Sequence, residues 1–141
     1  MPESEITEML PHAAPTDESD RLLLFAIRRV ASAGLNDAHA ANALIGAFGL
    51  SFRRPLVLVR ALMAEVSRAS TRKLLVAPCC CPRMTSSESS LMTAIALAIE
   101  SPYEAHRRLC VLLGVTSAVG ALGSAQALSQ AFEDLGRPLG A

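Results

Sequence analysis

A regular series of helix start and stop signals constrains this sequence more than any other feature. The clearest start is Thr85-Ser86-Ser87-Glu88, a capping box in which Thr85 and Glu88 satisfy each other's exposed backbone N–H groups. Ser101-Pro102-Tyr103-Glu104 repeats this pattern with proline at the first helical position. Glycines, which easily adopt the left-handed conformation of a helix end, stand where helices would stop: Gly34, Gly49, Gly114 and Gly136.

These signals divide the chain into six expected helices. We predict them over residues 17–33, 37–48, 52 or 55 to 71, 86–100, 102–113 and 117–135, with Asn36 capping the second. Half of the chain is apolar (51%) but only 4% is aromatic, so the core must be built from aliphatic side chains that suit close helix packing. The prediction is an all-α fold, a single compact bundle of about six helices with an irregular Cys-rich loop in the middle.

The first residues differ in composition from the rest. Residues 1–20 hold six acidic residues and no Lys or Arg, and prolines break residues 1–16 at Pro2, Pro11 and Pro15. We expect residues 1–16 to be an acidic flexible tail and residues 17–141 to form the single helical domain. The acidic start does not match a secretory signal peptide. We therefore expect a cytoplasmic protein, whose cysteines stay reduced.

The net charge is zero, yet the charges are unevenly placed. Residues 50–85 carry seven basic residues against Glu65 alone. Such a basic excess can attract nucleic acid, but aromatic residues for base stacking are nearly absent, and we do not expect nucleic-acid binding. Residues 109–132 carry no charge. Polar residues and Gly114 interrupt that stretch, so we do not expect it to span a membrane.

The loop Pro78-Cys79-Cys80-Cys81-Pro82 is the most unusual chemical feature. Three successive cysteines between prolines fit neither a buried helix face nor a strand. Three basic residues flank the loop, and the positive end of the next helix follows it; both would stabilise thiolate. The thiolate-supporting candidates are Arg72, Lys73 and Arg83.

A metal site is one interpretation of this loop. The candidate ligands are Cys79, Cys80 and Cys81 together with Cys110 and His106, which lie one helical turn apart and share a face. His39 and Met84 are further choices for a fourth ligand. The usual paired C-x2-C zinc spacing is absent, and a thiolate-rich site would suit zinc, copper(I) or an iron–sulfur cluster.

Redox chemistry is the other interpretation. Neighbouring cysteines can form a strained and easily reduced disulfide, which would act as a switch. An enzyme is less favoured, because no histidine lies beside the cysteines to serve as a base, and we assign no catalytic residue. We interpret Arg28 and Arg29 as surface residues, and Asp37 with His39 as part of a helix start.

Four segments carry a resemblance to a known group of proteins. They are Leu22–Arg29, Leu35–Ala43, Ser51–Leu56 and Ala77–Thr85, the last reading A-P-C-C-C-P-R-M-T. The chain resembles a family of small uncharacterised bacterial proteins, a domain of unknown function, over roughly residues 20–139. The triple-cysteine string is the most specific part. The resemblance implies no activity.

Two function hypotheses follow. The first is a small intracellular metal-thiolate or redox-sensing module that uses the cysteine loop. The alternative is a helical homo-oligomeric interaction protein without chemistry, such as a homodimer. High apolar content with few charges favours the alternative, because apolar helix faces can remain after the core is filled.

Overall fold

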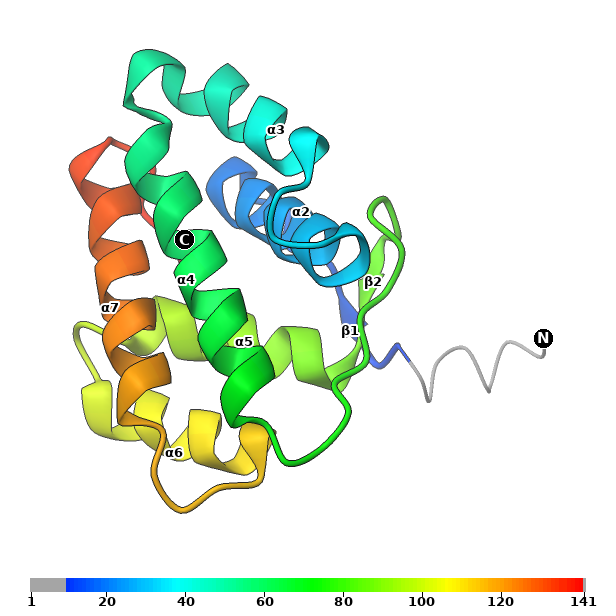
Figure 1. Ribbon diagram of the computed structural model, residues 1–141, viewed down its shortest axis with the longest axis vertical. Coiled ribbons are helices and arrows are strands. Elements are labelled where there is room, and N and C mark those ends of the chain that lie inside the picture. Colours follow the sequence, from blue (N-terminus) through cyan, green and yellow to red (C-terminus); the bar gives the residue numbers. More distant parts are fainter. Residues whose placement is uncertain (1–9, 141) are drawn as a thin grey trace, which may run out of the picture.

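The computed structural model describes residues 10–140, and that part of the chain contains six α-helices (Figure 1). They are α2 (Glu18–Ala33), α3 (Ala38–Phe48), α4 (Arg53–Ala69), α5 (Ser86–Leu97), α6 (Pro102–Leu113) and α7 (Val119–Asp134). A 3₁₀ turn, η1 (Gly49–Ser51), joins α3 to α4. Two short strands, β1 (His12–Ala13) and β2 (Arg83–Met84), pair antiparallel. The prediction of an all-α bundle of six helices is confirmed.

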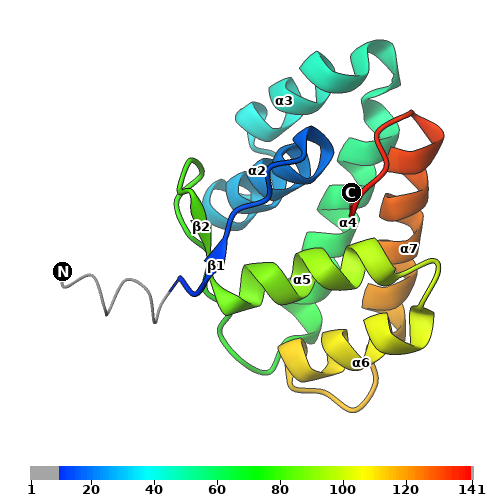
Figure 2. The same ribbon diagram turned by 180° about the vertical axis from the view of Figure 1, so that it is seen from behind.

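The helices surround one aliphatic core. Helices α4 and α7 lie side by side, α5 packs against both α6 and α7, and α3 covers one side of α2 (Figures 1 and 2). The fully buried side chains include Leu23, Leu62, Ile95, Leu109 and Phe132, one or more from nearly every helix. Close burial of Leu, Ile and Ala therefore holds the bundle together, as the composition indicates.

Most predicted helix ends are confirmed. Thr85 and Glu88 form the reciprocal capping box, and α6 ends at Gly114 with a φ of 68°. A side chain at Gly114 would be strained by this left-handed backbone and would also meet Thr71, so glycine is required there. Three boundaries shift inward by more than one residue: α4 ends at Ala69, α5 ends at Leu97, and α7 begins at Val119.

Two predicted caps are wrong. Asp37, not Asn36, caps α3, because its carboxylate accepts a hydrogen bond from the Ala40 N–H. Ser101 makes no side-chain cap at the start of α6. Glu104, the expected partner of Ser101 in a second capping box, instead pairs with arginines one turn later on the same helix.

The predicted acidic tail is described only from residue 10 onward; residues 1–9 lie outside the described residues. Strand β1 places His12 opposite Met84 and Ala13 opposite Arg83 in β2. The Ala14 N–H also donates to the Pro82 carbonyl at 2.8 Å. Residues 12–14 therefore run beside the cysteine loop, an arrangement that the sequence does not predict.

No helix within residues 10–140 has the length and apolar character needed to cross a membrane. This finding agrees with the expectation for residues 109–132, which the structure divides between α6 and α7.

Candidate functional site: the cysteine loop

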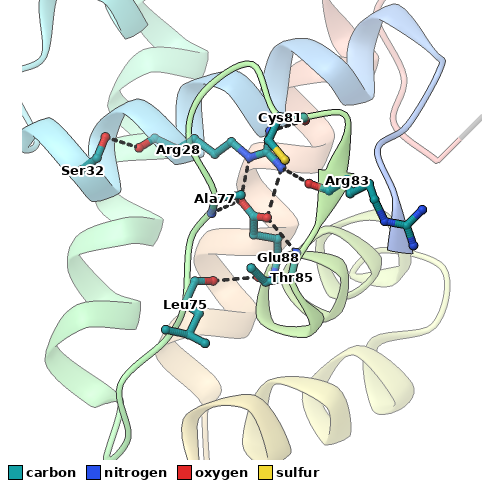
Figure 3. A network of polar contacts seen from close by, with 8 residues as sticks. All are labelled: Arg28, Ser32, Leu75, Ala77, Cys81, Arg83, Thr85 and Glu88. Carbon is teal, nitrogen blue, oxygen red and sulfur yellow. Dashed lines mark hydrogen bonds and ion pairs between the residues drawn. The ribbon is translucent and has the colours of Figure 1, made fainter. Parts of the chain in front are cut away.

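A buried ion pair stands at the base of the loop that carries the cysteines. Arg28 of α2 and Glu88 of α5 are joined by two hydrogen bonds, Nε to Oε2 at 2.6 Å and Nη2 to Oε1 at 3.1 Å (Figure 3). Only 2% of the Arg28 side chain and 1% of the Glu88 side chain are exposed. Removal of either partner would leave an uncompensated buried charge, which is strongly unfavourable.

The same pair hydrogen-bonds both sides of the loop. Arg28 donates to the Cys81 carbonyl at 2.9 Å and to the Arg83 carbonyl at 2.8 Å. Glu88 accepts from the Ala77 N–H at 3.2 Å and from the Thr85 N–H at 2.9 Å (Figure 3). Residues 77–85, which contain the cysteine loop Pro78–Pro82, are thus held on both sides by the Arg28–Glu88 ion pair. Most hydrogen-bonding atoms of that pair are already occupied.

The interpretation of Arg28 as a surface residue is wrong. Leu24 lies one helical turn before Arg28 and is itself buried, so the helical spacing places Arg28 on the inner face of α2. Glu88 satisfies a local cap and also reaches across the fold to α2. The helical spacing of Arg28 is a sequence signal that could have revealed its burial, but its partner, sixty positions away, was not predictable from spacing.

The tip of the cysteine loop is a hydrogen-bonded turn. The Cys81 N–H donates to the Pro78 carbonyl at 3.1 Å, which places Cys79 and Cys80 at the two central turn positions. Their Sγ atoms are 3.4 Å apart. Cys80 is exposed, and Cys79 and Cys81 are half-buried. The turn therefore holds two neighbouring thiols side by side at the surface.

Cys79 and Arg28 set the electrostatic surroundings of the Cys80 thiol at the tip. The hydrogen bond with Cys79, followed by the charge of Cys79 and by burial, raises the pKa of the Cys80 thiol, whereas the nearby charge of Arg28 opposes this shift. A negative charge on Cys79 therefore favours the protonated form of Cys80.

The cations that act on these thiols come from α2. The charge of Arg28 acts on Cys80 and opposes the rise in its pKa. The hydrogen bond to Asp37 is the largest cause that raises the pKa of Arg29, and the nearby Cys79 adds to this rise. Asp37 holds the Arg29 guanidinium through two hydrogen bonds, at 2.8 and 3.1 Å. Arg29, interpreted from the sequence as a surface residue, is half-buried by this contact.

The three predicted thiolate-supporting residues occupy other positions. The Arg83 side chain points away from Cys81 (Figure 3). It donates a hydrogen bond to the Leu10 carbonyl at 2.6 Å. Arg72 lies against Gly114 at the end of α6. Lys73 is exposed. Although these three residues are close to the cysteines in the sequence, none of them is among the groups that shift the pKa of Cys80.

The predicted metal ligands fall into separate groups. Cys110 and His106 meet on α6, with Sγ 3.6 Å from Nε2, and His106 accepts a hydrogen bond from the Ala118 N–H. Within residues 10–140, no hydrogen bond joins this pair to the cysteine loop. Within residues 10–140, no three His, Cys, Asp or Glu side chains are arranged to hold a metal ion. The described donors therefore give no support to a zinc, copper(I) or iron–sulfur site.

The two other suggested ligands are also unsuited to the loop. His39 is exposed near the start of α3, and Met84 is a buried residue of β2 opposite His12. The cysteines instead line a surface groove of about 900 Å³ together with the outer part of α2, including Arg21 and Phe25. The groove gives small molecules access to the thiols.

The fold and the loop define a small helical protein with two neighbouring surface thiols on a turn whose base is hydrogen-bonded to a buried ion pair. The chain belongs to DUF6628, a family of unknown function whose model matches residues 1–137. No curated protein and no solved structure matches the chain. The family carries no assigned activity, so the arguments for a function rest on the loop itself.

Proposed function

We propose that the protein is a thiol redox module in which Cys79 and Cys80 are oxidised to a disulfide by a peroxide. The observation that carries this proposal is the 3.4 Å separation of the two Sγ atoms at an exposed turn whose base is held by Arg28 and Glu88. Exposed thiols with a resolving cysteine beside them are the usual form of redox-sensing sites.

The reaction balances with hydrogen peroxide as the oxidant. The Cys79 thiolate attacks one peroxide oxygen, the O–O bond breaks, and the departing hydroxide takes a proton to become water. The Cys80 sulfur then attacks the sulfenic acid on Cys79, the S–O bond breaks, and the leaving hydroxide takes the Cys80 proton as a second water. The two thiols lose two electrons, and the peroxide gains them.

The assignment of the two roles follows from the electrostatics. A charged Cys79 raises the pKa of Cys80, so Cys80 stays protonated during the first step. After Cys79 becomes an uncharged sulfenic acid, neither the hydrogen bond to a Cys79 thiolate nor its charge raises the pKa of Cys80 any longer, so Cys80 gives up its proton more easily. Arg28 and Arg29 attract the negative charge that forms on either sulfur during the two steps.

The hydrogen bonds at the base of the loop should limit the structural change that oxidation causes. A disulfide between adjacent residues forms a small strained ring and must change the turn. The hydrogen bonds of Arg28 and Glu88 hold residues 77 and 81–85 in place. We infer that the change is confined to the tip and to the groove that the cysteines line.

Peroxide treatment followed by peptide mass analysis tests the proposal. Trypsin cleavage after Lys73 and Arg83 releases residues 74–83, which carry all three loop cysteines on one peptide. We expect this peptide to lose two hydrogen atoms, Cys81→Ser to retain the loss, and Cys80→Ser to leave a sulfenic acid on Cys79 that dimedone traps. Cys110 provides an internal comparison.

Three results would contradict the proposal. One is reaction of the loop thiols with peroxide no faster than Cys110. Another is direct conversion to sulfinic acid without a disulfide. The third is loss of the disulfide in Cys81→Ser, which would assign the bond to Cys81. A homodimer, the interaction hypothesis from the sequence, remains a prediction that light scattering on the reduced and oxidised protein can test.

A further inference from the structure

A second cavity lies on the other side of the buried ion pair. Its volume is about 640 Å³, within the usual range for small-molecule sites. Glu88 lines this cavity, whereas Arg28 lines the cysteine groove, so the ion pair separates the two. Most of the lining is apolar and comes from α2, the turn that follows it, α4, α5 and residues 70–76: Val30, Leu35, Met63, Leu74, Leu75 and Leu91.

The rim formed by residues 73–76 is weakly held. Leu75 and Val76 are 53% and 36% exposed, although both are large and apolar. The Leu75 carbonyl accepts a hydrogen bond from Thr85, but within residues 10–140 the N–H groups of 73–76 donate to no protein acceptor. An apolar occupant would cover these side chains, and the segment can adjust because few hydrogen bonds restrain it.

The charges around the cavity are not balanced. Both Glu88 oxygens already accept hydrogen bonds from Arg28 and backbone N–H groups, and Arg68 is paired with Glu65. Arg72 also lines the cavity and forms no ion pair within the described residues. The complementary ligand therefore has an apolar body and one anionic group.

We propose that this cavity binds a single-chain carboxylic acid, with the hydrocarbon chain among the apolar side chains and the carboxylate at Arg72. Burial of the chain supplies most of the affinity, because each buried methylene group is removed from water. Arg72 supplies the preference for a charged head over a neutral one. This inference is independent of the redox proposal.

Calorimetric titration of the full chain with decanoate and with 1-decanol tests the site. We expect decanoate to bind and Arg72→Gln to weaken it about fivefold, the upper range for one exposed ion pair, with 1-decanol unaffected. Arg107→Gln is the matched control, because Arg107 is exposed on α6 and does not line the cavity.

A blocked cavity supplies the second test. Ala64 and Ala61 are both exposed on α4, but only Ala64 lines the cavity. We expect Ala64→Trp to abolish decanoate binding and Ala61→Trp to leave it unchanged. Three results would overturn the proposal: no decanoate binding by the wild-type chain, unchanged binding by Ala64→Trp, or equal affinity for 1-decanol and decanoate.

Discussion

The base and the tip of the cysteine loop are only a few residues apart but differ in almost every physical property. At the base, Arg28 and Glu88 are almost fully buried and bind the backbone on both sides of the loop. At the tip, Cys79 and Cys80 lie on a turn, and Cys80 is exposed. The difference indicates that the base maintains the structure, whereas the tip is free for chemistry.

The largest expected effect comes from the base. Glu88→Gln preserves the size of the side chain but leaves the Arg28 charge buried without a partner. We expect a loss of about 3–5 kcal/mol in the free energy of unfolding, measured by urea denaturation. Arg107→Gln on α6 is the control, because 63% of that side chain is exposed and its ion pair contributes at most about 1 kcal/mol.

The double variant Arg28→Met, Glu88→Gln separates charge from packing. Without the Arg28 charge, the polar Gln can still accept a backbone hydrogen bond, so we expect the double variant to be more stable than Glu88→Gln alone. A loss in Glu88→Gln no larger than that in Arg107→Gln would show that the base does not hold the structure.

The capping box at the edge of the base should give the next largest effect. Thr85→Ala removes the cap of α5 and the hydrogen bond to the Leu75 carbonyl. We expect a loss of about 1 kcal/mol in urea denaturation. Ser101→Ala is the matched control at the start of α6. Since Ser101 makes no side-chain cap there, an equal loss in both variants would contradict the capping explanation.

A smaller effect is confined to acidic pH. The hydrogen bond from Arg29 lowers the pKa of Asp37 from its usual value to about 2. Because the folded-state pKa lies below the unfolded value, the stabilisation is complete above about pH 4 and is lost as the pH falls through about 2. We expect Asp37→Asn to reduce the fall in stability over this range. An unchanged pH profile would exclude Asp37 as a contributor.

The smallest stability change should come from the tip. We expect the double variant Cys79→Ser, Cys80→Ser to unfold within about 0.5 kcal/mol of the reduced wild-type chain, because surface substitutions away from special contacts are nearly neutral. The same variant should lose the peroxide-induced disulfide. A destabilisation comparable to that of Thr85→Ala would mean that the cysteines serve the structure, and the distinction between base and tip would fail.

The helices could be predicted because their signals are local. A capping box depends on residues three positions apart, so Thr85 and Glu88 identify the start of α5 from the sequence. The sequence does not distinguish Asn36 from Asp37 as the cap of α3, because they are adjacent and both residue types cap well. The pair of Asp37 with Arg29 also links α3 to α2. Local signals thus predict that a helix is present more reliably than they predict its first and last residues.

The amino-acid sequence alone predicts the helical bundle and identifies Pro78–Pro82 as the most unusual segment of the chain. Tertiary packing pairs Arg28 with Glu88, keeps Cys110 and His106 apart from the loop cysteines, and brings Arg29 rather than Lys73 to the thiols. The two kinds of interaction differ in range. Capping and helical periodicity act over a few residues, whereas ion pairing across helices depends on how distant faces meet in the packed core.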